Sequence, residues 1–281
     1  QQRSSPESNE IIKDIHNGII GEAYKAVAFY VNGRGEVPIA KKAAPPEGLD
    51  WDLFQGPAPR RDYTHDTWDY NWHWYGWEYG TAEMGNNATH ELDVARWALD
   101  VNYPEYVDVV AGKYHYKNDG WTMYDTMEAT YKFANNRTIK WDGQSRNNYD
   151  IYGQKRGRGT IVHGSKGSVF IDRSGYQLYD LAGKLLKDSK SAGNEAGTAL
   201  GGGGDMTTQH AKNFFNTIRG TEKLTSPIEQ GVVSQLLTHY ANISYRIGKS
   251  FNVDENTGRI FDRDAMKLWG REYEPGWEPK L

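Results

Sequence analysis

The sequence lacks several features that would point to common classes of protein. None of its 281 residues is cysteine, which excludes disulfides, thiol nucleophiles and thiolate metal sites. No run of 18 apolar residues is present and the opening segment is polar, so we expect neither a transmembrane helix nor a signal peptide here. A net charge of −4 without a basic stripe predicts no binding to nucleic acid. Cytoplasm and periplasm both stay open as locations.

A glycine-rich nucleotide-binding turn is also missing from the sequence. Such a turn follows a strand and opens a helix, with the spacing G-x-G-x-x-G. Gly33-Arg34-Gly35 follows a predicted strand but leads into a proline-rich stretch, and residues 201–204 follow no convincing strand. We therefore expect this chain alone to bind no cofactor.

Aromatic residues, in contrast, are abundant. Ten tryptophans and nineteen tyrosines exceed what a core of this size needs. These side chains combine a flat apolar face with a polar edge, which suits sugar rings and protein interfaces alike. The densest group lies in residues 63–80 and includes Trp72, His73 and Trp74. Its rings could stack on a pyranose while His73 bonds the hydroxyl groups, or they could line an interface between subunits.

Local patterns predict both strands and helices. The stretch 123–133 alternates between apolar and polar residues, which predicts a strand with one buried face. Ser5-Pro6-Glu7 begins a helix, and Ser226-Pro227-Ile228-Glu229 is a capping box for a long helix that runs to Gly248. Further helices are expected at about 87–99 and 206–219, and further strands at 23–31, 104–116, 138–146, 158–164, 168–172 and 176–180. Short strands joined by turns predict an α+β fold: an open, mainly antiparallel sheet with helices packed on one face, in a single domain over residues 1–281.

Five stretches, in order, resemble the C-terminal half of Gfo/Idh/MocA oxidoreductases. Residues 85–97, GNNATHELDVARW, resemble the helix that carries the catalytic histidine in the large bacterial subgroup, and the other stretches are 159–167, 210–215, 241–248 and 271–273. Family members begin with a Rossmann domain that contains a Glu-Lys-Pro motif, and neither is present in this sequence. Gln1-Gln2-Arg3 resembles the segment just after that domain. The resemblance implies the sugar-handling half, with NAD(P) involved only if a Rossmann domain is supplied.

The resemblance places the catalytic histidine at His90. A neutral imidazole can take the proton of a sugar hydroxyl, since its pKa lies near neutral pH. Packing between a helix and a loop is the alternative role for His90. Asn86, four residues earlier, stands where many relatives carry an aspartate, and its amide can orient a hydroxyl group but cannot ionise. A simple N-cap is the alternative for Asn86.

The remaining candidates are predicted to bind the substrate. They are Trp72, His73, Trp74, Tyr124 and Asp125, and Glu78 and Asp125 are also possible acid–base carboxylates. Histidine and carboxylate side chains can together bind zinc or iron. The side chains that could gather around such a metal are those of His65, Asp66, His73 and His90, but they lack a local metal-binding spacing, so no metal site is predicted.

Three functions fit these residues. The resemblance implies the substrate half of an NAD(P)-dependent sugar or polyol dehydrogenase, or of an NAD-dependent glycosidase. A cofactor-independent glycoside hydrolase or lyase on the same scaffold is one alternative, and a non-catalytic sugar-binding or assembly module is the other. The expected partner is a small carbohydrate or glycoside. An open sheet face and surplus aromatic residues also predict a homodimer or a larger assembly.

Overall fold

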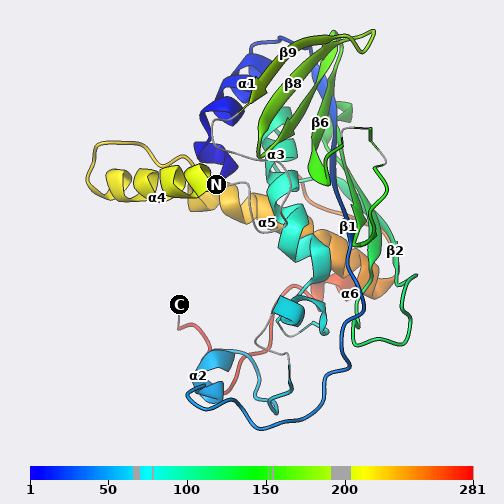
Figure 1. Ribbon diagram of the computed structural model, residues 1–281, viewed down its shortest axis with the longest axis vertical. Helices are drawn as coiled ribbons and strands as arrows, with labels where there is room; N and C mark the ends of the chain where they lie inside the picture. The colour runs from blue at the N-terminus through cyan, green and yellow to red at the C-terminus, as the bar shows by residue number, and fades with distance from the viewer. Residues whose placement is uncertain (66–69, 78, 151, 154, 191–203, 281) are drawn as a thin grey trace.

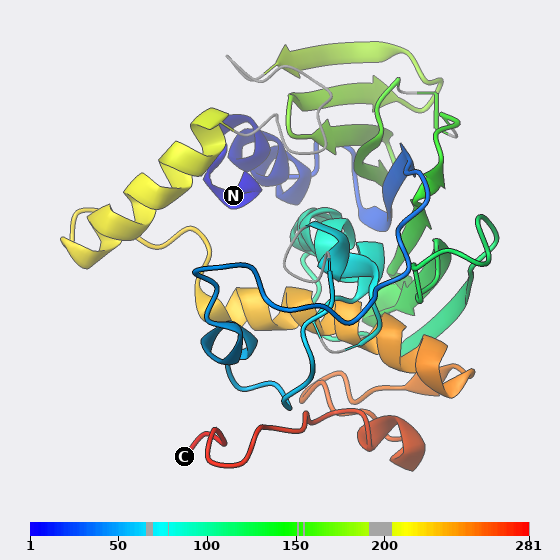
Figure 2. The ribbon, with the colours of Figure 1, turned by 60° about the horizontal axis from the view of Figure 1, so that its bottom comes forward.

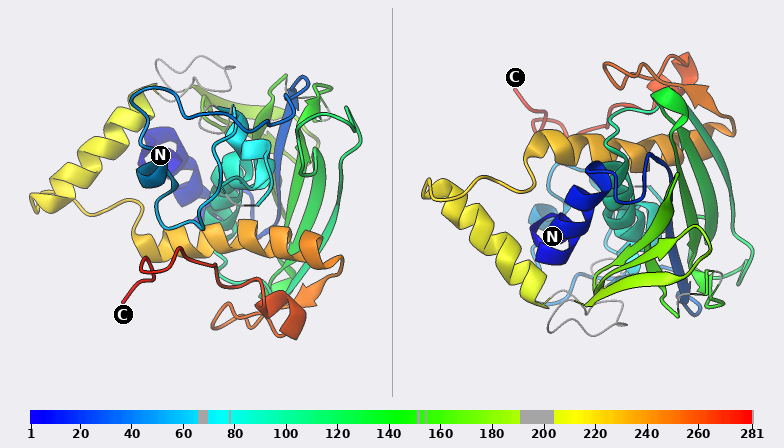
Figure 3. Two further views of the ribbon diagram at one scale, coloured as in Figure 1. Left: turned by 90° about the horizontal axis from the view of Figure 1, so that it is seen from below. Right: turned by 90° about the horizontal axis from the view of Figure 1, so that it is seen from above.

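The computed structural model describes residues 1–65, 70–77, 79–150, 152–153, 155–190 and 204–280. These residues form a ten-stranded sheet in the order β10-β2-β3-β4-β1-β6-β7-β8-β9, with β5 paired to β1 off this path. Helices cover one face of the sheet, while no helix of the described residues covers the other (Figures 1 and 3). The predicted α+β fold with an open sheet is therefore confirmed.

The helices and strands have the following bounds. The helices are α1 (Pro6–His16), α2 (Trp51–Gln55), α3 (Thr89–Leu99), α4 (Gly204–Ile218), α5 (Ile228–Ile247) and α6 (Arg263–Met266), with 3₁₀ turns η1 (Gln2–Ser4), η2 (Tyr70–Trp74) and η4 (Ala134–Asn136) and the π-helical turn η3 (Met84–Ala88). The strands are β1 (Ala23–Gly33), β2 (Tyr106–Gly112), β3 (Thr126–Lys132), β4 (Thr138–Gln144), β5 (Arg146–Asn147), β6 (Arg158–Gly164), β7 (Gly167–Asp172), β8 (Gly175–Asp180), β9 (Leu185–Lys190) and β10 (Phe251–Asn252). None of the described helices is long and apolar enough to cross a membrane.

The first strand of the chain lies in the middle of the sheet. Strand β1 pairs in parallel with β4, where Val27 lies opposite Lys140, and antiparallel with β6, where Val27 lies opposite Ile161. The other neighbouring strands along the sheet are antiparallel. A parallel pair needs a crossover connection, and here the chain between β1 and β4 makes that crossover, carrying α3 over the sheet. Figure 2 shows α3 and α5 together on this face.

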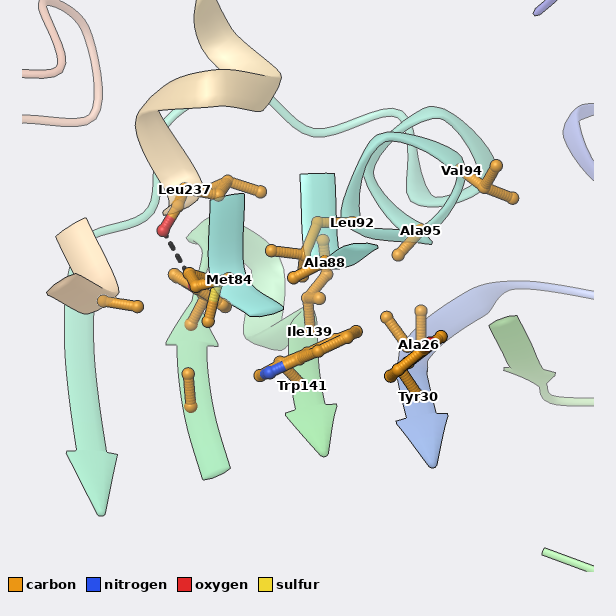
Figure 4. Close-up of a cluster of buried hydrophobic side chains, with 14 of the residues drawn as sticks. Ala26, Tyr30, Met84, Ala88, Leu92, Val94, Ala95, Ile139, Trp141 and Leu237 are labelled. Carbon is orange, nitrogen blue, oxygen red and sulfur yellow. Dashed lines mark hydrogen bonds between the residues drawn. The ribbon is translucent and has the colours of Figure 1, made fainter. Parts of the chain in front are cut away.

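The core lies between α3 and the centre of the sheet. Leu92 and Ala95 occupy one side of α3, one turn apart, and both are fully buried. Figure 4 shows Leu92 above Ile139 and Trp141 of β4, and Ala95 on the side of Tyr30 of β1. Burying such apolar side chains is the main force that holds a helix on a sheet. The position of α3 on the sheet is therefore fixed by its apolar side.

The N-terminal segment is bound directly to α3. The Nε and Nη2 atoms of Arg3 donate to the two carboxylate oxygens of Asp93, each at 2.8 Å. Ser5 caps α1 as predicted, because its Oγ accepts from the backbone N–H of Ser8 at 3.3 Å. The Arg3 guanidinium also lies over the ring of Trp97, 5.0 Å from its centroid. Polar contacts thus join residues 1–5 to the helix that carries His90.

Two predicted helix starts are corrected. The capping box at Ser226 is wrong: α5 begins at Ile228, and Pro227 occupies the N-cap position without a side-chain cap. Ser226 therefore lies one residue outside the cap. The N-cap role considered for Asn86 is also wrong, because the backbone is already helical in the π-turn η3 that contains it. Its side chain bonds other side chains instead of a backbone N–H.

Candidate functional site

His90 occupies the first turn of α3, and its side chain is partly exposed. No hydrogen bond of its ring is formed with any residue that the structure describes. Burial lowers the pKa of His90 to about 3, with further lowering by the positive charges of Arg173, Arg158 and the α-amino group, while Asp93 opposes the shift. The imidazole is therefore neutral at pH 7, and both ring nitrogens remain available to a ligand.

A π-helical turn immediately precedes α3 and contains Asn86. Such turns add a residue to the helical turn and are frequent at functional sites. The Nδ2 group of Asn86 donates to the hydroxyl of Tyr70 at 3.1 Å and lies 3.5 Å from Oε2 of Glu83. Its Oδ1 atom has no partner among the described residues. Asn86 is thus held by its amino group and presents its carbonyl oxygen as a free acceptor, one turn from His90.

The buried carboxylate of Glu83 contacts the side chains around Asn86. Glu83 is only 2% exposed, and a carboxylate is costly to bury unless it is paired. Arg34 donates from Nε to Glu83 at 2.7 Å, and Asn87 donates from Nδ2 to the other carboxylate oxygen. Arg34 also reaches the hydroxyl of Tyr70 at 3.5 Å. One buried carboxylate therefore connects both asparagines with the tyrosine that bonds Asn86.

Strand β6 contacts the same helical turn from the other side through Arg158. Its Nε donates to Oε1 of Glu91 at 2.8 Å and its Nη1 donates to Oδ1 of Asn87 at 2.9 Å. Glu91 is 1% exposed, and its second oxygen is buried without a hydrogen-bond partner in the described part of the chain. In addition, Thr160 donates to the backbone carbonyl of Glu91 at 3.0 Å. These bonds fix the backbone around His90 without using its ring.

Two of the predicted aromatic residues lie beside this site. In η2 the rings of Trp72 and His73 stack, with centroids 3.7 Å apart, and both side chains are partly exposed. The ring of His73 lies 4.6 Å from that of Tyr70, which bonds Asn86. Burial lowers the pKa of His73, and so does Arg34, although a hydrogen bond with the backbone carbonyl of Tyr70 opposes the shift. Substrate binding by Trp72 and His73 stays a prediction.

The other three predicted substrate-binding residues are buried, and their assignment is revised. Trp74 is 1% exposed and stacks on Trp121 at 4.3 Å between centroids. The hydroxyl of Tyr124 donates to Oδ1 of Asn242 at 2.7 Å in the interior. The carboxylate of Asp125 is buried and accepts from the backbone N–H groups of residues 114 and 115. Side chains in these positions cannot touch a sugar from solvent, so their role is in the fold.

The candidates for a metal site are not brought together in the part of the chain that the structure describes. No group of three histidine or acidic side chains there has a metal-binding arrangement. His65 belongs to a loop contact instead, because its Nδ1 accepts from the backbone N–H of Lys41 at 2.8 Å. Asp66 and Glu78 lie outside the described residues.

Several residues of the site were missed by reasoning from the sequence. They are Arg34, Tyr70, Glu83, Glu91, Arg158 and Arg173. They come from the residue after β1, from η2, from the N-cap of η3, from α3, from β6 and from the turn after β7, and no spacing in the sequence connects these segments. Glu91 carried a signal because it lies within the histidine motif, and Tyr70 because it lies within the aromatic segment 63–80.

Comparison with solved structures identifies the fold. An oxidoreductase from Agrobacterium radiobacter in complex with NAD+, L-tartaric acid and magnesium is 11% identical, with a TM-score of 0.60, and the match covers 89% of this chain and 62% of that one. Aldose-aldose oxidoreductase from Caulobacter crescentus complexed with glycerol is 14% identical, with a TM-score of 0.59 and coverages of 89% and 62%. Levoglucosan dehydrogenase in complex with NADH and levoglucosan is 18% identical, with a TM-score of 0.57 and coverages of 89% and 63%. The chain has the fold of Gfo/Idh/MocA-type oxidoreductases.

The resemblance predicted from five sequence motifs is thus confirmed at the level of the Gfo/Idh/MocA fold. This chain spans about three fifths of the length of the solved structures that it matches. No protein-family model matches the sequence, and no curated protein matches it. Because the sequence identities are below 20%, these structural matches establish only the fold. The activity has to be argued from the residues of the site.

Proposed function

We propose that this chain is the substrate-handling domain of a carbohydrate oxidoreductase, with the reacting hydroxyl group bound at His90. One observation carries the proposal: among the described residues, the neutral imidazole of His90 has no hydrogen-bond partner, and it lies one helical turn from the amide oxygen of Asn86, which has none either. The side chain of His90 is partly exposed, so a ligand can reach its ring from solvent. The hydrogen bonds of the described residues around His90 hold the neighbouring backbone and side chains, and none of them uses its ring.

His90 and Asn86 would have different roles toward a bound sugar. Oxidation of an alcohol removes the hydroxyl proton and a hydride from the same carbon. The neutral ring of His90 accepts the proton, and Oδ1 of Asn86 accepts a hydrogen bond from a neighbouring hydroxyl, which fixes the orientation of the sugar. A pKa of about 3 keeps the free ring unprotonated but also makes it a weak base, so proton transfer to His90 requires that substrate binding raise this pKa.

A nicotinamide cofactor does not fit the described residues of this chain. Its usual cradle is a strand, a glycine-rich turn and a helix. Strand β1 ends at Gly33 and continues into a loop, and the next helix, α2, begins only at Trp51. Neighbours of the same fold were solved with NAD+ or NADH. NAD(P) would therefore be supplied by a separate nucleotide-binding unit, and this chain contributes substrate binding and proton transfer.

Carbohydrate specificity is supported by the neighbours and by the aromatic residues of η2. One neighbour is a levoglucosan dehydrogenase and another is an aldose-aldose oxidoreductase. In this chain the stacked pair Trp72 and His73 lies on the side of the site from which Tyr70 bonds Asn86. Aromatic faces suit the apolar side of a sugar ring.

Binding of free sugars and polyols to the purified chain tests the proposal. We expect saturation-transfer NMR to detect binding, with His90→Ala and Asn86→Ala each weakening it at least fivefold. His65→Ala is the matched control, because this histidine bonds a loop backbone outside the site. Equal binding by wild type and His90→Ala would contradict the proposal.

Turnover distinguishes the dehydrogenase from the two alternatives. Aryl glycosides and free sugars are incubated with the chain, with and without NAD and an added nucleotide-binding unit. Activity that needs the nucleotide and falls by about 10²–10⁴-fold in His90→Ala is the expected result. Turnover without nucleotide, abolished by the same change, would favour a hydrolase or lyase. Binding without turnover in either condition would favour a sugar-binding module.

A further inference from the structure

The pair Asn-Gly occurs twice in the sequence, at Asn17-Gly18 and at Asn32-Gly33. Asparagine is a thermolabile residue, because the backbone nitrogen of the next residue can attack its side-chain amide. Glycine in the next position favours this attack, since it has no side chain in the way and its backbone adopts many conformations. The fold places the two pairs in different surroundings, and these surroundings decide which pair can react.

Asn17-Gly18 lies in the exposed turn between α1 and β1. Asn17 is the C-cap residue of α1, and Gly18 follows it with a φ of +86°. Both residues are exposed, and a side chain added at Gly18 would meet nothing within 4 Å. The side-chain amide of Asn17 forms no hydrogen bond with any residue that the structure describes. Its carbonyl carbon is therefore accessible, and no hydrogen bond in the described part of the chain holds the amide away from the backbone.

Two hydrogen bonds at the end of α1 have to open before Gly18 can attack. The backbone N–H of Gly18 donates to the carbonyl of Ile15 at 2.9 Å, and that of Ile19 donates to the carbonyl of Asp14 at 3.0 Å. These bonds close an exposed helix terminus, and such termini open by local fraying at little cost in free energy. The folded chain therefore reaches the reactive conformation of this turn without unfolding as a whole.

Asn32-Gly33 is held by the sheet instead. Asn32 lies in β1 opposite Asn147 of β5, and Gly33 lies opposite Arg146. The Nδ2 group of Asn32 donates to the hydroxyl of Tyr30 at 2.7 Å, which fixes the amide that would have to react. Rotation of the backbone at this pair would break the pairing of β1 with β5. The fold therefore protects Asn32, although its sequence context is the same as that of the exposed pair.

We propose that Asn17 is a site of spontaneous deamidation to isoaspartate in the folded chain, whereas Asn32 is protected. The backbone nitrogen of Gly18 forms a bond to Cγ of Asn17, the bond from Cγ to Nδ2 breaks, and the proton of the attacking nitrogen leaves with Nδ2 as ammonia. Water then opens the five-membered imide at one of its two carbonyl carbons. Opening at the backbone carbonyl leaves isoaspartate, which carries a negative charge and adds one carbon atom to the main chain.

The product disturbs the contact between α1 and α3. His16, the residue before Asn17, bonds through Nε2 to the backbone carbonyl of Trp97 at 2.9 Å. A negative charge at the C-terminal end of a helix is unfavourable, because this end already carries the partial negative charge of the helix dipole. Deamidation therefore loosens the end of α1 and its contact with the helix that carries His90.

Ageing the purified 281-residue chain in mildly alkaline buffer tests this proposal. Peptide mapping by mass spectrometry measures conversion at both Asn-Gly pairs, and methyl transfer by an isoaspartate carboxyl methyltransferase measures the isoaspartate formed. We expect Asn17 to convert roughly tenfold faster than Asn32 or more, because Asn32 reacts only when its part of the sheet opens. In urea, where both pairs are unfolded, the two rates should become similar. Asn17→Gln should remove the methyl acceptor, and Asn32→Gln, the same change at the protected pair, is the matched control that should retain it.

Each contrary outcome overturns a defined part of the proposal. Equal rates at the two pairs in the folded chain would show that the fold makes no difference. An unmodified Asn17, after a time in which the chain in urea is converted, would show that the turn does not open. Methylation that persists in Asn17→Gln would place the isoaspartate at another residue. Hydrogen exchange over α1 should be faster in the aged chain than in the fresh one, and equal exchange would contradict the loosening of this helix.

Discussion

The contact between Arg3 and Asp93 offers a sharp test of how the N-terminal segment is held on α3. We consider the substitution Asp93→Asn, which keeps the size of the side chain and removes its charge. Asp93 accepts two hydrogen bonds of 2.8 Å from Arg3, and the hydroxyl of Ser234 on α5 donates to it as well. The Arg3 side chain is only 7% exposed, so its charge would remain buried without a counter-ion.

Breaking a buried ion pair by removing one partner costs about 3–5 kcal/mol. Asp93 keeps some contact with solvent, and asparagine still offers one acceptor oxygen, so we expect the free energy of unfolding to fall by about 2–3 kcal/mol. A loss of this size corresponds to a decrease in Tm of roughly 4–12 °C for a protein of this length. Urea unfolding at pH 7 measures the change, and Asp108→Asn, on an exposed strand position, is the control.

The dependence on pH gives a second readout of the same contact. Burial would raise the pKa of Asp93, but the hydrogen bonds and positive charge of Arg3 outweigh it, and the pKa is lowered overall. A carboxylate whose pKa is lower in the folded state stabilises the protein above its unfolded pKa of about 3.9. This stabilisation is lost as the pH falls through the lower folded value. The difference between wild type and Asp93→Asn should therefore shrink in acid, and an equal difference at pH 3 and pH 7 would refute the reasoning.

Three further predictions concern the core, the cofactor and assembly. Leu92→Ala should lower the free energy of unfolding by about 2–5 kcal/mol in urea titrations, because this side chain is fully buried against β4, and a loss below 1 kcal/mol would contradict the packing described. The purified chain should bind NAD(H) and NADP(H) only weakly in calorimetry, and a micromolar Kd would reveal a nucleotide site that we have missed. Light scattering should give at least twice 31.9 kDa if the uncovered sheet face binds a second copy, and a monomer would exclude this assembly at the concentration tested.

Much of the secondary structure could be predicted because it depends on neighbouring residues. Alternation over residues 123–133 predicted β3 (Thr126–Lys132), and the predicted strand at 23–31 is β1 (Ala23–Gly33). Strand order could not be predicted in the same way. The parallel pairing of β1 with β4 joins residues about 110 positions apart, and nothing in the local pattern of either strand encodes its neighbour. Two predicted helix starts were wrong because the backbone differs from what the local motif suggests. Pro227, not Ser226, is the N-cap of α5, and a π-turn precedes α3.

The aromatic segment shows why composition alone could not locate a binding surface. Trp72, His73 and Trp74 are consecutive residues of the short 3₁₀ turn η2. Within this turn the rings of Trp72 and His73 stack on each other, whereas the ring of Trp74 stacks on Trp121. Trp72 and His73 accordingly keep contact with solvent while Trp74 turns inward onto Trp121. A sequence shows that an aromatic residue is present. The direction of its side chain depends on the geometry of the turn, which the secondary-structure propensities of the residues do not specify.

Two buried ion pairs near the start of α3 hold the turn before His90 in position. Glu83 and Glu91 are both almost inaccessible to water, and each is paired with an arginine, Arg34 and Arg158. Replacing a buried ion pair by apolar residues of similar size is often neutral or stabilising, so stability alone does not account for two such pairs. Both pairs bond the asparagine-containing turn before His90, and neither bonds the ring itself. Their geometric effect is to hold the imidazole of His90 and the amide oxygen of Asn86, neither of which has a hydrogen-bond partner among the described residues, in a fixed relation, as the proposed binding of a sugar hydroxyl would require.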